Sequence, residues 1–199
     1  YSVNQVLNEA QNIKNRTAMG IKKLMDSLIL TGIGMSFVGN SRPASGSEHH
    51  LSHYIEIQAL LENFEIPLHG EKVACGTVIT QKLRERLINT NKELKENKEF
   101  KFSLANWKSD ILNKYKEASH EIFSLSEKND TLSEAKRLKR LASIEANKDA
   151  IIELLSSGPS SKDIMDIFDS IELDYGYSYI SHEMLEDAIL YAKEIRDRY

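Results

Sequence analysis

Apolar residues recur every three or four positions along almost the whole chain, which places them on one face of an α-helix. The first such stretch starts at the beginning of the chain and includes Val3, Val6 and Ile13. The second runs from about residue 21 to residue 33 and carries a broader apolar face. A face of that width is typical of a helix that is covered on most sides. We therefore expect the second stretch to form a central, buried helix.

Breaker and capping residues divide the rest of the chain into further helices. Residues 39–43 predict a turn, a helix restarts near Ala44 or Ser45, and another begins near His69. Four more helical stretches follow, near 104–115, 131–155, 162–173 and 181–195. A Ser-, Gly- and Pro-containing break at 156–161 separates the second from the third, and Ser181 caps the last one. The chain contains no run of alternating β-branched residues, so the pattern predicts no strand. The pattern therefore predicts an all-α domain of roughly eight to ten helices.

The overall composition excludes several classes of protein. Of the 199 residues, 41% are hydrophobic and 28% are charged, as in an ordinary globular chain rather than a disordered one. Basic residues number 26 and acidic residues 30, and this net charge of -4 argues against a nucleic-acid binder. Cys75 is the single cysteine, which excludes a disulfide scaffold and suits a reducing compartment.

No segment has the pattern of a membrane-spanning helix or of an export signal. No stretch approaches the roughly 18 apolar residues of a membrane span, and the chain does not open with a signal-peptide pattern. We therefore expect a cytoplasmic protein. The chain begins at Tyr1, directly in a helical pattern. We interpret this as a start inside a longer protein, so that part of the functional unit is expected to lie elsewhere.

Histidines are concentrated in one region of the chain. Four of the six lie between positions 49 and 69: His49, His50, His53 and His69. On a helix, His49 and His53 share a face, whereas His50 points about 100° away. Two imidazoles on one face, joined by a third from the start of the next helix, can converge on a divalent metal ion. The pair alone is more typical of ordinary surface or core histidines.

The residues around the histidines favour a binding site. Small residues at 44–47 would let backbone amides approach a ligand at a helix N-terminus, which attracts anions. Arg42 and Lys72 could offset negative charge on a substrate. Gly70 and the small residues at 74–76 would let the second helix pack closely beside the first. We expect Glu48 to act as a cap or as a hydrogen-bond acceptor for a histidine, and Glu56 to be structural.

Two motifs together carry a resemblance to a known group of enzymes. The sequence Ser-Gly-Ser-Glu-His-His-Leu-Ser-His-Tyr-Ile-Glu at 45–56, followed by His-Gly-Glu-Lys-Val-Ala at 69–74, resembles the metal-dependent polyol dehydrogenases and dehydroquinate synthases. The version at 41–49, Ser-Arg-Pro-Ala-Ser-Gly-Ser-Glu-His, is most similar to the sn-glycerol-1-phosphate dehydrogenases. The chain end at 191–199 is similar to the bacterial branch of that family. We expect the resemblance to cover most of the chain, but only the family's C-terminal helical half.

The resemblance implies an architecture and a set of site residues. Residues 1–199 would form one C-terminal helical domain that binds metal and substrate. The α/β nucleotide-binding domain and an aspartate, the third metal ligand, would lie upstream. His49 and His69 match the metal ligands, and His53 matches the catalytic histidine that contacts substrate. Arg42 and Ser45 are candidates for binding the substrate phosphate.

The resemblance also implies a reaction. The family interconverts dihydroxyacetone phosphate and sn-glycerol 1-phosphate by hydride transfer, in glycerophospholipid metabolism. The implied cofactors are NAD or NADP and a divalent metal, with zinc, nickel and iron all compatible with these ligands. We expect a small phosphorylated substrate, a homo-oligomer such as a dimer, and no activity from the 199 residues alone. Two alternatives stay open: another polyol dehydrogenase or dehydroquinate-synthase-like enzyme, and a metal-free helical interaction module.

Overall fold

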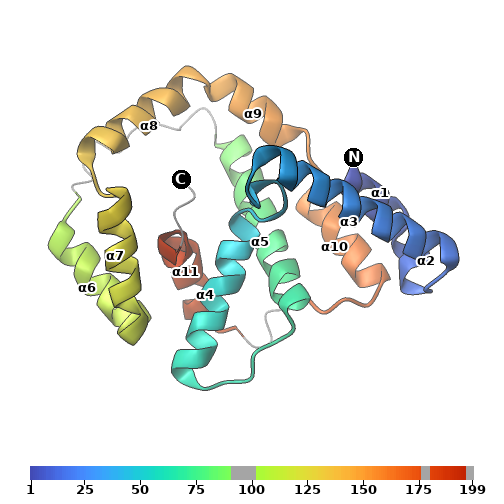
Figure 1. Ribbon diagram of the computed structural model, residues 1–199, viewed down its shortest axis with the longest axis horizontal. Helices are drawn as coiled ribbons and strands as arrows, with labels where there is room; N and C mark the ends of the chain where they lie inside the picture. Colours follow the sequence, from blue (N-terminus) through green and yellow to red (C-terminus); the bar gives the residue numbers. More distant parts are fainter. Residues whose placement is uncertain (91–101, 176–179, 196–199) are drawn as a thin grey trace.

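The computed structural model describes residues 1–90, 102–175 and 180–195 (Figure 1). All regular elements in these three ranges are helical, so the predicted all-α class is confirmed. The α-helices are α1 (Ser2–Asn8), α2 (Ala10–Lys14), α3 (Ala18–Val38), α4 (Ser47–Glu62), α5 (His69–Asn89), α6 (Leu104–Tyr115), α7 (Ser119–Asn129), α8 (Glu134–Ala146), α9 (Lys148–Ser156), α10 (Ser161–Ser170) and α11 (His182–Tyr191). Short 3-10 helices are η1 (Arg42–Ala44), η3 (Lys116–Ala118) and η4 (Ala192–Ile195).

The described ranges thus hold eleven α-helices, slightly more than the eight to ten that the sequence predicts. The first periodic stretch is divided between α1 and α2 at Glu9, whose backbone leaves helical geometry with φ -103° and ψ 12°. A break at one residue does not disturb the three- and four-residue spacing, so periodicity alone misses it. Ser181 caps α11 as expected, and its hydroxyl accepts from the Met184 amide. Residues 196–199 of the family-like chain end lie outside the described residues.

The helices α4 and α5 form the centre of the domain and pack side by side (Figure 1). Both helices carry fully buried residues, with Tyr54 and Ile55 on α4 and Cys75 and Val78 on α5 at 1% exposure or less. The core continues into α6, α7, α11 and η4. The rings of Tyr54 and Tyr115 meet edge to face at 5.6 Å, a favourable aromatic arrangement.

Gly76 allows an unusually close approach between α5 and the first turn of α4. A β-carbon at Gly76 would lie 2.5 Å from the carbonyl oxygen of Glu48, a distance that real atoms do not adopt. The expectation that small residues let these helices pack tightly is therefore confirmed. This contact also holds the beginning of α4, where the histidines lie, against α5.

The long helix α3 differs from the sequence prediction. Of its 21 residues only Gly20 and Ser27 are buried, and Leu28 and Ile29 are each 57% exposed. The prediction of a central buried helix is therefore wrong. An apolar face shows that a helix suits burial, but it does not specify a partner that covers it. Among the described residues α3 packs mainly against α1, α2 and η1.

Two side chains of α2 connect the N-terminal helices to the rest of the domain. Gln11 and Lys14 both donate to the carbonyl oxygen of Ser170, at 2.9 and 3.2 Å. Lys14 also pairs with Glu172 at 2.9 Å. Within the described ranges, no helix has the length and apolar composition needed to cross a lipid bilayer.

Candidate metal and substrate site

Three imidazoles lie together where the start of α5 meets the first half of α4. His49 and His53 are one turn apart on α4, and His69 is the first residue of α5. The ring centroids of His49 and His69 are 5.6 Å apart, those of His53 and His69 are 6.2 Å apart, and those of His49 and His53 are 6.5 Å apart. The structure thus gathers the three histidines that the sequence singles out.

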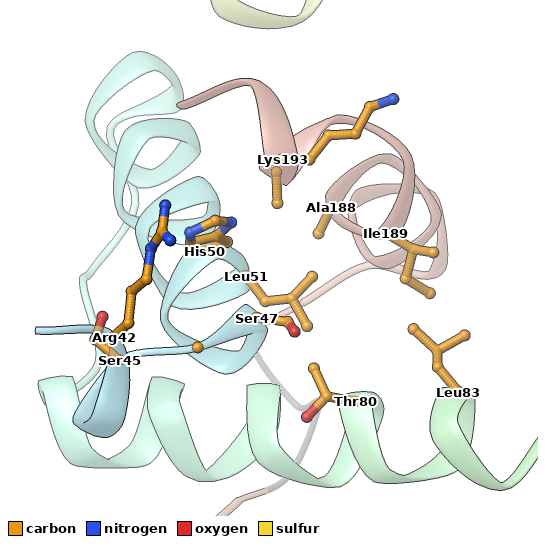
Figure 2. Close-up of a pocket in the computed structure, with 12 residues that line it drawn as sticks. Arg42, Ser45, Ser47, His50, Leu51, Thr80, Leu83, Ala188, Ile189 and Lys193 are labelled. Atoms are coloured by element: carbon orange, nitrogen blue, oxygen red, sulfur yellow. The ribbon is translucent and has the colours of Figure 1, made fainter. Parts of the chain in front are cut away.

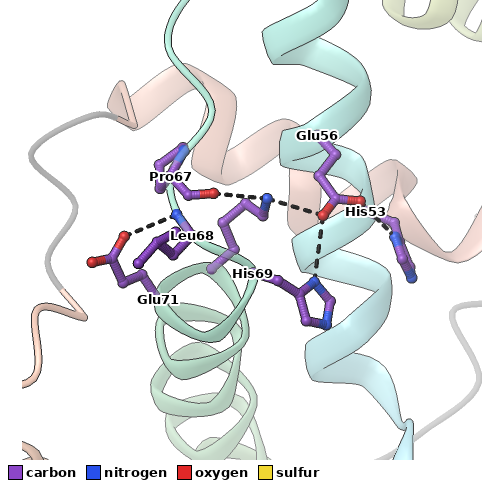
Figure 3. Close-up of polar contacts among 7 residues, drawn as sticks. His53, Glu56, Pro67, Leu68, His69 and Glu71 are labelled. Carbon is purple, nitrogen blue, oxygen red and sulfur yellow. Dashed lines mark hydrogen bonds and ion pairs between the residues drawn. The ribbon is translucent and has the colours of Figure 1, made fainter.

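Each of these rings directs its Nδ1 atom to a carboxylate. His49 Nδ1 lies 2.8 Å from Glu48 Oε1, and His53 Nδ1 lies 2.8 Å from Glu56 Oε2. The other oxygen of Glu56, Oε1, lies 3.4 Å from His69 Nδ1 (Figure 3). Glu48 is therefore the histidine acceptor that the sequence allows. The expectation that Glu56 is merely structural misses its contact with two imidazoles.

Lys72 stabilises the carboxylate of Glu56. Its side chain is only 3% exposed, and its Nζ lies 2.9 Å from Glu56 Oε1. The same Nζ donates to the carbonyl oxygen of Pro67 at 3.0 Å. Lys72 therefore pairs with a carboxylate of the protein, whereas the sequence suggests a substrate charge as its partner. The available signal was spacing, since Glu56 follows His53 by three residues and Lys72 follows His69 by three.

Both carboxylates are ionised at neutral pH. Burial by itself would raise the pKa of Glu56, but hydrogen bonds from Lys72 and His53, with the charge of Lys72, lower that pKa to about 2. Burial also opposes ionisation of Glu48, whose pKa is nevertheless lowered by hydrogen bonds from His49 and the Gly46 amide. Ionised carboxylates only accept hydrogen bonds. They therefore favour a proton on the Nδ1 atom that faces them.

The spacing of the rings fits a shared metal ion best for one pair. Two imidazoles that bind one tetrahedral zinc through Nε2 have ring centroids about 5 Å apart, given Zn–N bonds of about 2.1 Å. His49 and His69, at 5.6 Å, come nearest to that value. The described residues include no group of three or more His, Cys, Asp or Glu side chains arranged to hold a metal. His49 and His69 thus fit as two of the ligands that a metal ion needs, without a third ligand among the described residues.

Arg42 and Ser45 lie just before α4, on the side of that helix that carries His50. They line a cavity of about 430 Å³ together with His50, and Lys193 lines it as well (Figure 2). His49, His53 and His69 are not among the residues that line this cavity. His50 is 8% exposed and points away from the three clustered rings, as its position on the helix predicts. The structure therefore places the predicted phosphate-binding residues next to the histidine turn but in a separate hollow.

Comparison with known proteins adds to this geometry. No family model and no solved structure matches the chain. Curated proteins named glycerol-1-phosphate dehydrogenase [NAD(P)+] do match. The protein from Bacillus licheniformis is 43% identical over 90 residues, which are 45% of this chain and 22% of that protein. The protein from Geobacillus stearothermophilus is 50% identical over 60 residues, 30% of this chain and 15% of that protein.

An archaeal protein of the same name, from Pyrococcus furiosus, is 41% identical over 78 residues, 39% of this chain and 21% of that protein. Over less than half of its length, the chain is similar to proteins named glycerol-1-phosphate dehydrogenase. The resemblance that the two histidine motifs indicate is thus confirmed. The matched stretches span only about a fifth of the length of these dehydrogenases. They also cover at most 45% of this chain, so the expectation that the resemblance covers most of the chain is wrong.

Proposed function

We propose that this chain is the metal- and substrate-binding domain of a glycerol-1-phosphate dehydrogenase. The whole enzyme would interconvert dihydroxyacetone phosphate and sn-glycerol 1-phosphate with NAD or NADP. The observation that carries the proposal is the convergence of His49, His53 and His69, each backed by a carboxylate. The name shared by the relatives of this chain supports the same reaction.

His49 and His69 would hold a divalent metal, either zinc, nickel or iron. Such an ion, when bound, polarises the C2 oxygen of the substrate and favours hydride transfer between C2 and the nicotinamide. The protein orients the imidazole rings that would bind the ion. Glu48 and Glu56 accept from Nδ1 of these rings, which leaves the Nε2 lone pair for a ligand bond. The third protein ligand, an aspartate in our prediction, would come from a part of the enzyme upstream of this chain.

His53 would act on the substrate itself. Its ring lies 6.2 Å from that of His69, farther than the pair proposed as metal ligands. From there its Nε2 can accept a hydrogen bond from the substrate hydroxyl or relay that proton. The Nδ1 atom of His53 already contacts Glu56, so the proton exchange with substrate would occur on the opposite edge of the ring.

The substrate phosphate would lie at the N-terminus of α4. The helix begins at Ser47, and a helix N-terminus favours an anion. The Gly46 amide already donates to Glu48 Oε1 at 2.7 Å, so the amides of Ser45 and Ser47 are the candidates for the phosphate. Arg42 and Lys193 line the neighbouring cavity and add positive charge. Ser45 would contribute a hydroxyl. We further propose a cytoplasmic homo-oligomer, and no activity for the 199 residues without the nucleotide-binding domain.

A substrate comparison tests the proposed function. In the intact enzyme that contains this chain, we expect NADH- or NADPH-dependent reduction of dihydroxyacetone phosphate, and far slower reduction of dihydroxyacetone. Chelation should abolish the reaction, and re-addition of zinc, nickel or iron one at a time identifies the metal. Equal rates with the unphosphorylated ketone would favour a glycerol or polyol dehydrogenase. No reaction with either ketone in the metal-loaded enzyme would contradict the proposal.

A further inference from the structure

We propose that Glu56, held in place by buried Lys72, is a positioning residue that keeps the protons of both His53 and His69 on Nδ1. It thereby determines that Nε2 is the nitrogen without a proton in both rings. What the rings bind rests on the proposed function. The proton positions follow from the contacts of this chain alone.

The two oxygens of Glu56 have separate partners. Oε2 faces His53 Nδ1 at 2.8 Å, while Oε1 faces Lys72 Nζ at 2.9 Å and His69 Nδ1 at 3.4 Å. A carboxylate accepts hydrogen bonds and cannot donate them when ionised. Each ring must therefore supply the proton from Nδ1. One carboxylate on α4 thus orients an imidazole on its own helix and one on α5.

Lys72 explains why this carboxylate keeps its orientation. A charged ammonium that is 3% exposed must be paired, and Glu56 is its ionic partner at 2.9 Å. Its second bond, to the Pro67 carbonyl at 3.0 Å, links the carboxylate to the loop before α5. At the same helix start, Glu71 accepts from the Leu68 amide at 3.0 Å (Figure 3). Leu68 before His69 and Lys72 after it are therefore both fixed by hydrogen bonds.

Replacement by glutamine makes a specific prediction, because an amide has one accepting oxygen and one donating nitrogen. Lys72 can only donate, so the oxygen of Gln at position 56 must stay on the side of Lys72 and His69. The amide nitrogen then faces His53 Nδ1, which must accept. The proton of His53 should consequently move to Nε2, while His69 keeps its proton on Nδ1.

Long-range ¹H–¹⁵N NMR spectra of the imidazoles, recorded on the metal-free 199-residue chain at pH 8, test this directly. That pH lies above the usual imidazole pKa of about 6.5. In the unaltered chain we expect a protonated Nδ1 and an unprotonated Nε2 on both His53 and His69. A proton on Nε2 of either ring would overturn the proposal, and this readout requires no variant to fold.

In Glu56→Gln we expect the protonated and unprotonated nitrogens of His53 to exchange places and those of His69 to stay. Glu62→Gln, an exposed change on the same helix, is the matched control and should alter neither ring. An unchanged His53 in Glu56→Gln would overturn the proposal. A merely structural glutamate would not exchange the two nitrogens of one ring selectively. Because metal, substrate and nucleotide are absent, a failure of the proposed dehydrogenase function would not affect this result.

Discussion

The helices α3 and α5 are both 21 residues long, yet they relate to the domain in opposite ways. The more apolar of the two, α3, leaves large side chains such as Leu28 and Ile29 exposed. The more polar one, α5, buries even a lysine, Lys72. Hydrophobic content alone therefore does not determine which helix becomes central. The decisive difference is whether a neighbouring helix can approach.

Close approach on α5 comes from small residues in a row. Ala74, Cys75 and Gly76 are all buried, and Gly76 touches the backbone of α4. On α3 the corresponding device is Gly20, whose β-carbon would lie 2.3 Å from backbone atoms of Asn12. That contact brings the N-terminal helices onto α3 rather than bringing α3 into the core. Small residues thus predict helix contacts more locally than apolar stripes do.

Matched truncations on the two sides of this comparison should differ most. Ile55→Ala, at a residue 1% exposed on α4, should lower the free energy of unfolding by roughly 2–4 kcal/mol. Leu28→Ala, at 57% exposure on α3, should change it by no more than about 0.5 kcal/mol. Urea unfolding followed by circular dichroism measures both. Equal losses would show that α3 is buried in solution and would break the comparison.

The glycine contact gives the next largest effect. Gly76→Ala should destabilise the chain by about 1–3 kcal/mol, because the added methyl group overlaps the backbone of Glu48. Gly70→Ala is the control on the same helix, where a β-carbon meets no atom within 4 Å. It should be neutral or stabilise by up to about 1 kcal/mol through helix propensity. Thermal unfolding of both variants decides whether close approach or glycine loss itself matters.

Acid should weaken the connection between α4 and α5. The pKa of Glu56 is lowered to about 2 in the folded chain, so its stabilising contribution is complete above its unfolded pKa and is lost as the pH falls towards 2. We expect Glu56→Gln to lower the free energy of unfolding by the order of 2 kcal/mol at pH 7. The difference between the two chains should shrink steadily between about pH 4.5 and about pH 2. A difference that is independent of pH would exclude the ionised carboxylate as its source.

The smallest expected effect concerns the thiol of α5. Cys75 is completely buried, and burial, with the charge of Asp174, raises its pKa to about 11. The native chain should therefore resist alkylation by iodoacetamide at pH 8, and should react readily in urea. Rapid labelling of the native chain would mean that the packing of α5 against α4 opens frequently.

The sequence predicts a large part of this fold because the signals are local. Ser181 caps α11, and the break at 156–161 precedes α10, as the capping and helix-breaking residues at these positions indicate. The convergence of His49, His53 and His69 follows from helical spacing and one short connection. The pair of Glu56 and Lys72 was missed because its two members lie on different helices, which helical spacing does not relate. The exposure of α3 was missed because the sequence of a helix does not show which other elements pack against it.

Metal binding by the histidines tests the central claim most directly. Cobalt(II) or zinc(II) titrated into the chain should bind at one site, and His49→Ala and His69→Ala should each weaken that binding at least about tenfold. His182→Ala, at an 87% exposed side chain far along the sequence, is the control and should leave the affinity unchanged. Unchanged affinity in both His49→Ala and His69→Ala would contradict the account.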